Sequence, residues 1–454
     1  MITGQSTLHP GFPTWGTMLR DHGYRTYYYG KWHLTRADHR WGAHDGPSSL
    51  ARYGFDGGTF PSPDGAPGQG WRADPLIAAQ FDEGYRHAAG DGPWCTTVSF
   101  VNPHDIAWWW RWSRVAAVEA SAPRTVAALP PNFETPAQLL ARRKPSVQRS
   151  LQETAAVSFG AVPFEGPSAH AAWLPFLDLY VKLQRQVDLQ VGSVMATLAQ
   201  RRKVLENTIV VFTSDHGEYG ASHGLRGKGA GMYEEAIRVP LIVSDFTGPT
   251  AHSRNTVRTQ LTSSVDVAPL LLTLGHGSAG WRSDPRYAHL ADRPDLARML
   301  HDPAAPGREY ALHATDEVMT EFALLPYAAA APLHVAGVVT RRAKYATYSN
   351  WRSNTLEPLA HGEEAELYDL TTRSGALEIE NLAGRTAAEH GMRATLKRAI
   401  RDELRAPVPG TMLEAQRHGI AEYHRLAAAD RVVSQLHRTR AVERVIQQIE
   451  RHLP

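Results

Sequence analysis

Short apolar segments alternate with longer amphipathic ones over the first 250 residues of the chain. Runs rich in aromatic and β-branched residues predict strands, because such side chains pack well on a pleated surface. Four strands of this kind are expected at residues 24–29, 95–101, 208–213 and 239–243. Apolar residues in steps of three and four from Leu174 to Leu198 predict a long helix. The alternation favours an α/β fold, a three-layer α/β/α sandwich with a mostly parallel, mixed central sheet.

The pattern changes after about residue 330. Strand-like segments at residues 334–340, 344–348 and 366–370 predict a small antiparallel sheet. From Gly410 onwards, an apolar stripe at helical spacing predicts a helical tail. We therefore expect an α/β domain (1–330), a small α+β subdomain (331–400) and a helical extension (401–454).

Three stretches are less informative about structure and function. The tail stripe favours a helix that packs on its own body or on a sister subunit, so a homo-oligomer is possible; a membrane-surface helix is the alternative. Residues 61–68 form a Pro/Gly cluster without a period, which predicts a loop. Residues 121–168, rich in Ala, Pro and Arg, are expected to be loop-like and to cover one edge of the sheet.

Composition excludes several classes of protein. The 454 residues include 48 Lys and Arg against 46 Asp and Glu, a net charge of +2 that argues against a nucleic-acid-binding arm. A lone Cys95 excludes an intramolecular disulfide framework and a cysteine-based zinc site, and its place inside a strand predicts a buried structural thiol. No apolar run approaches the roughly 20 residues of a membrane span, and no signal peptide is visible.

Polar residues that are candidates for catalysis or metal binding follow the third predicted strand. Asp215 and His216 come directly after it, where an open α/β sheet binds ligands, and a carboxylate beside an imidazole suits a divalent cation. The alternative for Asp215 is a helix N-cap. The Gly-rich loop that follows carries His223 and Lys228. Flexible backbone and a lysine charge next to a metal site suit a tetrahedral oxyanion, so we expect this loop to contact substrate.

Two other strands end in similar residues. Lys31 and His33 follow the first strand, two positions apart, and share a side if the strand geometry continues. His104 follows the second strand within the sequence NPHD, where the proline helps to end the strand. Each of the three strand ends is thus followed by a histidine. This repetition is stronger evidence for a shared site than any one motif, because a single histidine can be an ordinary surface residue.

The aromatic run that follows His104 is unusual. Four tryptophans lie between Trp108 and Trp112. Trp108 and Trp109 are candidates for the wall of a pocket that binds an aromatic or sugar leaving group. The alternative is that the rings pack onto the neighbouring Ala/Pro-rich region.

Taken together, these motifs resemble the sulfatases of the alkaline phosphatase superfamily. The matching pieces are GKWHL, NPHD, SDHGE, SHGLRGK, MYEEAIRVPLIV and AELYDL, in this order between about Gly4 and Ala383. The resemblance implies a sulfuric ester hydrolase with a divalent cation, usually Ca²⁺, with Mg²⁺ or Mn²⁺ as alternatives. Its substrate would be a small-molecule sulfate or phosphate ester.

The resemblance also implies roles for individual residues. Asp215 and His216 would be metal ligands, and Lys31 and Lys228 would neutralise the sulfuryl oxygens. His104 would protonate the leaving alcohol. His33 would help to expel sulfate from a covalent intermediate.

The chain departs from the family pattern at its start. Relatives have a first strand that ends in two acidic metal ligands, followed by a C/S-x-P-S-R motif whose Cys or Ser becomes formylglycine. Here MITGQ resembles the end of that region, so we expect the strand, both acids and the nucleophile to be encoded upstream of Met1. Without them, the TIVVFT strand would keep an uncovered apolar edge. The alternative is a degenerate or repurposed protein.

Three functions remain open from the sequence. The first is sulfate ester hydrolysis by a longer form, with the present chain inert. The second is phosphodiester or phosphonate monoester hydrolysis, and the third is a non-catalytic module that binds an anion or a protein. The compartment is not predicted, although a chain that starts at Met1 would be cytoplasmic.

Overall fold

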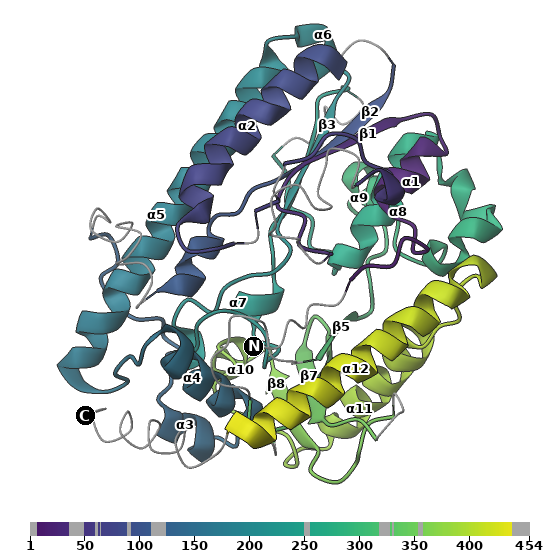
Figure 1. Ribbon diagram of the computed structural model, residues 1–454. Helices are drawn as coiled ribbons and strands as arrows, with labels where there is room; N and C mark the ends of the chain where they lie inside the picture. The colour runs from purple at the N-terminus through teal and green to yellow at the C-terminus, as the bar shows by residue number, and fades with distance from the viewer. Residues whose placement is uncertain are drawn as a thin grey trace.

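We analysed a computed structural model of the chain (Figure 1). It describes residues 7–35, 50–59, 62–63, 65–88, 92–109, 124–248, 255–316, 327–328, 331–352 and 357–437, with side chains up to residue 429. The strands are β1 Arg25–Gly30, β2 Trp94–Ser99, β3 Ile209–Thr213, β4 Leu241–Asp245, β5 Ala311–Asp316, β6 His334–Val339, β7 Ala343–Ser349 and β8 Glu364–Asp369. The helices are α1 Trp15–Arg20, α2 Gln69–Ala88, α3 Pro136–Ala141, α4 Ser146–Phe159, α5 Gly166–Ala199, α6 Arg202–Leu205, α7 Glu234–Ile237, α8 Val267–His276, α9 Leu296–His301, α10 Arg373–Ala376, α11 Ala388–Ala399 and α12 Leu413–His437.

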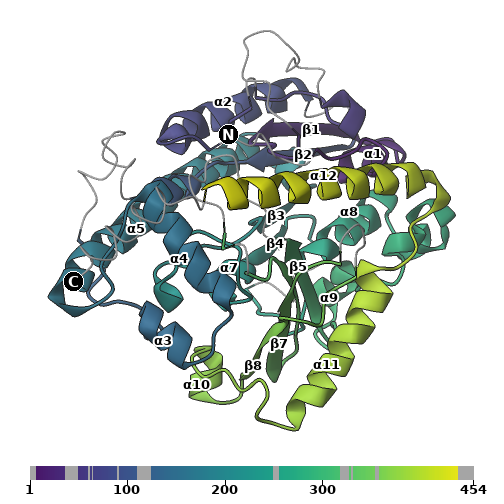
Figure 2. The same ribbon diagram turned by 60° about the horizontal axis from the view of Figure 1, so that its bottom comes forward.

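The larger part of the molecule has helices on both faces of its central strands. Helices α2 and α5 lie side by side on one face (Figures 1 and 2), where Ile77 and Leu198 share a core with Tyr29 of β1. On the opposite face, Leu270 of α8 shares a core with Val211 of β3. The predicted α/β architecture is therefore confirmed. No helix in the described part of the chain is long and apolar enough to cross a bilayer.

The expected loop over residues 121–168 is wrong in part, because it contains the helices α3 and α4. Thr135 caps α3 through a capping box with Gln138. Helix α2 was also not expected from the sequence, and it contains Pro75. Its apolar side chains Ile77, Phe81 and Tyr85 are buried in a core with β1.

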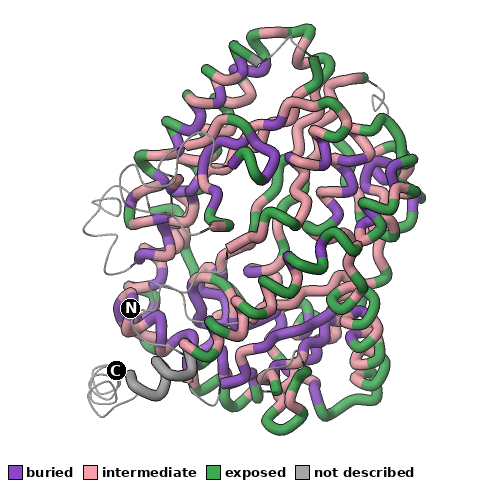
Figure 3. The backbone as a smooth tube through the Cα atoms, turned by 45° about the vertical axis from the view of Figure 1, so that its right-hand side comes forward, coloured by how far each residue is buried: buried purple, intermediate pink, exposed green. Residues whose placement is uncertain are grey.

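The smaller sheet has the strand order β5-β6-β7-β8, and every neighbouring pair is antiparallel. The three strands expected from the sequence are confirmed as β6, β7 and β8. Strand β5, which lies before the expected boundary at residue 331, also belongs to this sheet. The domain boundaries therefore stay a prediction. Buried residues dominate β6 and β7 (Figure 3), which agrees with a core between this sheet and α11.

The helical tail is present as α12, which begins at Leu413. It lies against the first described residues: Glu422 accepts a hydrogen bond from the Thr7 N–H at 3.2 Å, and the ring of His418 lies 5.1 Å from that of His9. The side chains that form most of the apolar tail stripe, from Val432 onwards, lie outside the described residues. Oligomer formation through that stripe remains a prediction.

The central strands form two separate pairs. Strands β1 and β2 are parallel, with Gly30 opposite Ser99, whereas β3 and β4 are antiparallel, with Phe212 opposite Ile242. Within the described residues, no backbone hydrogen bond links one pair to the other. Phe212 is 41% exposed and Ile242 56% exposed. Central strands of an α/β sheet are normally covered on both faces, whereas Phe212 of the TIVVFT strand and Ile242 of its partner strand are exposed here.

This exposure predicts the effect of a polar substitution. Ile242→Thr should change the free energy of unfolding by less than about 0.5 kcal/mol, because the side chain has little contact to lose. The matched change Val335→Thr, at a fully buried strand position, should cost about 1–3 kcal/mol because it buries a hydroxyl. Urea denaturation measures both values. Ile242→Thr should also reduce light scattering from aggregates, since exposed apolar strands promote association. An equal loss of stability in the two variants would show that Ile242 is covered.

Candidate active site

Three strand ends bring the predicted residues together. Because β1 and β2 are parallel and in register, their last residues lie at the same edge, and the Lys31 N–H donates to the Ser99 carbonyl at 2.9 Å. His104 follows β2 at the start of a short 3-10 helix, η2 His104–Trp108. Strand β3 leads into Asp215 and His216.

The electrostatics of His104 show how close these groups are. Burial holds the pKa of His104 well below its usual range, and the charges of four neighbouring side chains lower it further. Those neighbours are Lys31, Lys228, His216 and His33. The His104 Nδ1 atom is buried and has no hydrogen-bond partner in the described structure. His104 is therefore a neutral imidazole at neutral pH unless an anion joins the site.

Asp215 and His216 face each other after β3. Their Oδ2 and Nε2 atoms are 3.3 Å apart. His216 Nδ1 lies 2.8 Å from the Gly217 carbonyl, so this nitrogen donates and Nε2 keeps its lone pair. Burial raises the pKa of Asp215, but His216, its backbone N–H and Lys228 outweigh that effect and lower it. A carboxylate oxygen and an imidazole lone pair thus lie side by side.

These two donors fit part of a divalent-cation site. Calcium takes six to eight oxygen ligands, and transition metals accept imidazole nitrogen. In the part of the chain that the structure describes, three or more candidate ligands come together only at His223, Glu235 and Glu378. There the Glu378 carboxylate already pairs with the Lys344 ammonium. The predicted pair Asp215 and His216 supplies only two ligands, and its role in holding a cation stays a prediction.

The Gly-rich loop after His216 is closed by a half-buried carboxylate. Glu218 accepts hydrogen bonds from the backbone N–H of Gly227 at 2.7 Å and of Gly220 at 3.3 Å. Both glycines have positive φ, a conformation that other residues rarely adopt. The loop leaves Lys228 exposed at its end. Burial lowers the pKa of Lys228, whereas Asp215 and Glu218 act in the opposite direction.

Comparison with known proteins identifies the family. The family model described as Sulfatase matches residues 2–278. The chain belongs to the sulfatase family. Over 294 residues it is 27% identical to the uncharacterised sulfatase YidJ of Escherichia coli K12. This match covers 58% of this chain and 52% of that protein. The chain thus spans about half the length of this relative.

Solved structures share the fold of this sulfatase-family chain. A protein of Bacteroides thetaiotaomicron described as a candidate sulfatase is similar with a TM-score of 0.61 and 21% identity, over 88% of this chain and 76% of that one. A phosphonate monoester hydrolase of Agrobacterium radiobacter is similar with a TM-score of 0.55 and 17% identity, over 88% and 82% of the two chains. At this level of identity the two matches establish the fold.

The structure gives His223 a different role from the predicted contact with substrate. Its side chain is fully buried, with Nδ1 2.6 Å from Glu134 and Nε2 3.2 Å from the Asn132 amide nitrogen. The imidazole also stacks on Tyr233 at 3.6 Å between ring centroids. These contacts enclose the ring on several sides. His223 therefore braces the Gly-rich loop from behind, and its predicted substrate contact finds no support.

The two predicted tryptophans also lie in the interior. Trp109 is fully buried, and its ring centroid lies 5.0 Å from Phe176 and 6.3 Å from Trp173. Trp108 is 7% exposed, and its indole N–H donates to the Gly65 carbonyl at 2.5 Å. This arrangement corresponds to the packing alternative rather than to a pocket wall. The rest of the aromatic run, Trp110 to Trp112, lies outside the described residues.

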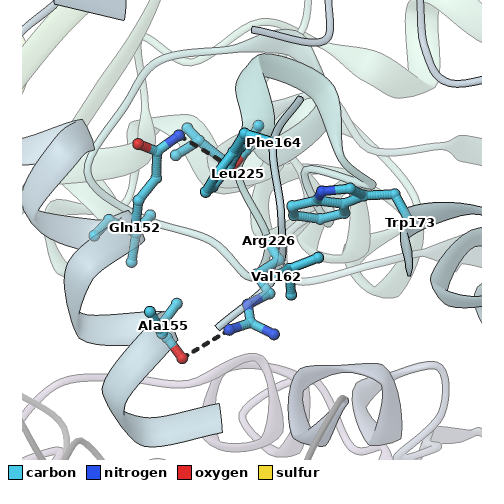
Figure 4. Close-up of a pocket in the computed structure, with 10 residues that line it drawn as sticks. Gln152, Ala155, Val162, Phe164, Trp173, Leu225 and Arg226 are labelled. Carbon is cyan, nitrogen blue, oxygen red and sulfur yellow. Dashed lines mark hydrogen bonds between the residues drawn. The ribbon is translucent and has the colours of Figure 1, made fainter. Parts of the chain in front are cut away.

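A shallow pocket of about 290 Å³, counting space open to solvent, lies behind the Gly-rich loop (Figure 4). Trp173, Phe164 and Leu225 line it together with Gln152 and Arg226. Gln152 Oε1 is buried there without a hydrogen-bond partner in the described structure. Arg226 donates to the carbonyls of Ala155 at 2.7 Å and Trp109 at 3.0 Å. None of the predicted catalytic residues lines this pocket, so it is separate from the strand-end site.

Sequence reasoning did not find the residues that support the site. Asp74 on α2, Asp105 in η2 and Glu218 each accept two backbone hydrogen bonds in or next to the segments that carry His104 and Lys228. Asp105 and Glu218 stand inside the quoted motifs NPHD and SDHGE, which was the available signal. Nothing in the sequence around Asp74 distinguishes it from a solvent-exposed residue.

The electrostatics of His104 lead to a testable expectation. Lys31→Met should raise the pKa of His104, because it removes a positive charge that disfavours the imidazolium. Titration of the His104 Cε1–Hε1 resonance by NMR measures the shift, with a His104→Gln variant for assignment. Lys203→Met, which removes an exposed lysine on α6, is the matched control and should leave the pKa unchanged. Identical titration curves for Lys31→Met and the parent chain would contradict the proximity of the two groups.

Proposed function

We propose that this chain forms the anion-binding and leaving-group side of a sulfuric ester hydrolase centre. The observation that carries the proposal is the convergence of Lys31 after β1, His104 after β2 and Lys228 in the loop that follows β3. Fixed cations next to a titratable imidazole suit an ester whose negative charge grows in the transition state. Membership of the sulfatase family supports sulfate as the ester group.

The proposed roles follow from where charge develops. Lys31 and Lys228 would stabilise the non-bridging sulfuryl oxygens, which gain charge as the ester bond breaks. His104 would give its proton to the leaving alcohol oxygen. Because neighbouring cations lower the pKa of His104, a bound sulfuryl anion would raise it again and so favour the protonated, active form. His33 would assist the later release of sulfate.

A divalent cation would be held in part by the Asp215 carboxylate and His216 Nε2, and it would polarise an ester oxygen as a Lewis acid. The lone cysteine does not supply a nucleophile: burial raises the pKa of Cys95 to about 12, so it is a thiol at neutral pH. This agrees with its predicted structural role. We infer that the nucleophile and the remaining cation ligands come from outside the described residues.

Phosphodiester or phosphonate monoester hydrolysis is the second candidate. Its support is the shared fold with the phosphonate monoester hydrolase. Lysine ammonium groups act as point charges that serve a phosphoryl or a sulfuryl group equally well. The choice between the two esters depends on a direct comparison of substrates.

Binding of inorganic sulfate tests the anion site. Lys228→Met should weaken binding roughly tenfold or more, because hydrogen bonds to a charged group contribute about 1.5–3 kcal/mol. Isothermal titration calorimetry at constant ionic strength measures the dissociation constant, since added salt screens such interactions. Lys203→Met is the control and should bind like the parent. Sulfate binding that survives both Lys31→Met and Lys228→Met would refute the anion site.

Ester hydrolysis tests the reaction. Under this proposal the chain alone should turn over neither 4-nitrophenyl sulfate nor 4-nitrophenyl phosphate in the presence of Ca²⁺ or Mg²⁺, because it would lack the nucleophile and part of the cation site. A chain extended by an apolar strand, two acidic residues and a C/S-x-P-S-R sequence, with formylglycine formed, should hydrolyse the sulfate ester faster. Faster release from the phosphate ester would favour the second candidate. Cation-dependent turnover by the 454-residue chain would falsify the view that groups are missing. An extended chain that binds sulfate but remains inert would indicate a non-catalytic module.

A further inference from the structure

The turn that carries His104 is held from helix α2. After β2 the chain passes through Val101 and Asn102 before it reaches His104. The Asp74 carboxylate accepts the Val101 N–H at 2.6 Å through Oδ1 and the Asn102 N–H at 3.0 Å through Oδ2. Asp74 is only 2% exposed, so water competes little for these bonds. Both oxygens of one buried carboxylate are thus used by two consecutive backbone groups of the turn.

The attachment is reciprocal. Asp105, the residue after His104, accepts hydrogen bonds from the N–H groups of Gly70 at 3.2 Å and Trp71 at 3.1 Å, in the first turn of α2. A carboxylate at a helix N-terminus satisfies amides that lack partners in the helix itself. The chain is therefore attached to α2 on both sides of His104, through backbone N–H groups before it and through the Asp105 carboxylate after it. His104 lies between the two points of attachment.

The imidazole depends on this backbone for its direction. His104 Nδ1 has no hydrogen-bond partner in the described structure, so no acceptor on that side orients the ring. Gly65 lies against the ring: a Cβ atom at this position would come within 2.5 Å of His104 Cε1. The ring is therefore confined by packing on one side and by its own main chain.

We propose that Asp74 is a positioning residue for His104: by accepting the N–H groups of Val101 and Asn102, it fixes the turn that aims the imidazole at the anion site. This inference rests on the proposed function only in taking His104 to lie next to a bound anion. Asp74 does not touch the reacting atoms in this scheme. It acts through the backbone that it holds.

The titration of Asp74 agrees with a role other than stability. Burial raises its pKa to about 6, the charge of Asp105 raises it as well, and the two N–H groups lower it. A carboxyl whose pKa is higher in the folded than in the unfolded state favours folding at low pH, and this contribution is lost as the pH rises through about 6. The ionised form present at neutral pH thus opposes folding. The arrangement is more easily explained by what Asp74 holds than by what it adds to stability.

Asp74→Asn and Asp74→Ala test the proposal. The amide keeps one acceptor, faces the second N–H with a donor and removes the buried charge, so Asp74→Asn should melt close to the parent at pH 7.5 because the loss of one hydrogen bond is offset by the loss of the charge. Its His104 Cε1–Hε1 resonance should nevertheless broaden or shift, and the change that inorganic sulfate causes in this resonance should fall at least twofold. Asp74→Ala, which retains no acceptor, should show a larger loss. Asp82→Asn, on the same helix, is the matched control and should leave the resonance and its response unchanged.

The outcomes separate the two proposals. An Asp74→Asn variant with the parent's His104 resonance and sulfate response would overturn the positioning role, whatever its melting temperature. If Asp74→Ala fails to fold, Asp74→Asn decides alone. If the parent binds no sulfate, the proposed function fails, and a changed His104 resonance in Asp74→Asn would still support the positioning role. A Lys228→Met variant should lose sulfate affinity while its His104 resonance stays sharp, which distinguishes loss of charge from loss of position.

Discussion

A buried imidazole held next to two lysine side chains is the arrangement on which the site depends. Lys31, Lys228 and three histidines converge at the strand ends, and Asp215 is the acidic residue that acts on both His216 and Lys228. Burial and the neighbouring positive groups together lower the pKa of His104, whereas burial alone lowers that of Lys228. Such a group of side chains would separate unless its backbone were held in place.

Carboxylates next to the site hold this backbone in place. Asp74 and Asp105 anchor the segment of His104 to α2, and Glu218 closes the loop that ends at Lys228. Each of them binds backbone N–H groups rather than the cations themselves. These carboxylates therefore fix the backbone that carries the site residues, but they do not occupy the position of a substrate anion. Rigid support of this kind is what an electrostatic site requires.

The smaller sheet supports the site from the other side. Lys344 of β7 is 1% exposed in its side chain, and its ammonium binds the Met232 carbonyl at 2.8 Å and Glu234 at 2.7 Å. It also contacts Glu378. These residues follow directly on the Gly-rich loop, so the sheet fixes the end of the loop that carries Lys228. Buried ion pairs contribute little net stability, but they favour one arrangement over others.

The sequence allowed the front of the site to be predicted but not its support. The proximity of Lys31 and His104 could be predicted because the parallel strands β1 and β2 place their carboxyl ends at one edge, so that residues after different strands meet. His223 was misjudged because a Gly-rich loop suggests exposure, whereas Glu134 and Tyr233, far apart in sequence, enclose its ring. Asp74 was missed for the same reason, since its partners lie 27 and 28 residues away. Burial of polar loop residues is decided by tertiary packing, which leaves no local pattern.

Two unmet requirements of this chain coincide in space. The β2 and β3 edges share no backbone hydrogen bond in the described residues, and Phe212 and Ile242 remain uncovered. At the carboxyl ends of the same strands, Lys31 and Lys228 lie near His104, and Asp215 with His216 supplies only two of the ligands that a divalent cation needs. An additional apolar strand that ended in carboxylates would pair the backbone, cover the apolar side chains and add ligands at once. Under the proposed function, the gap in the sheet and the shortage of ligands would have one physical explanation rather than two.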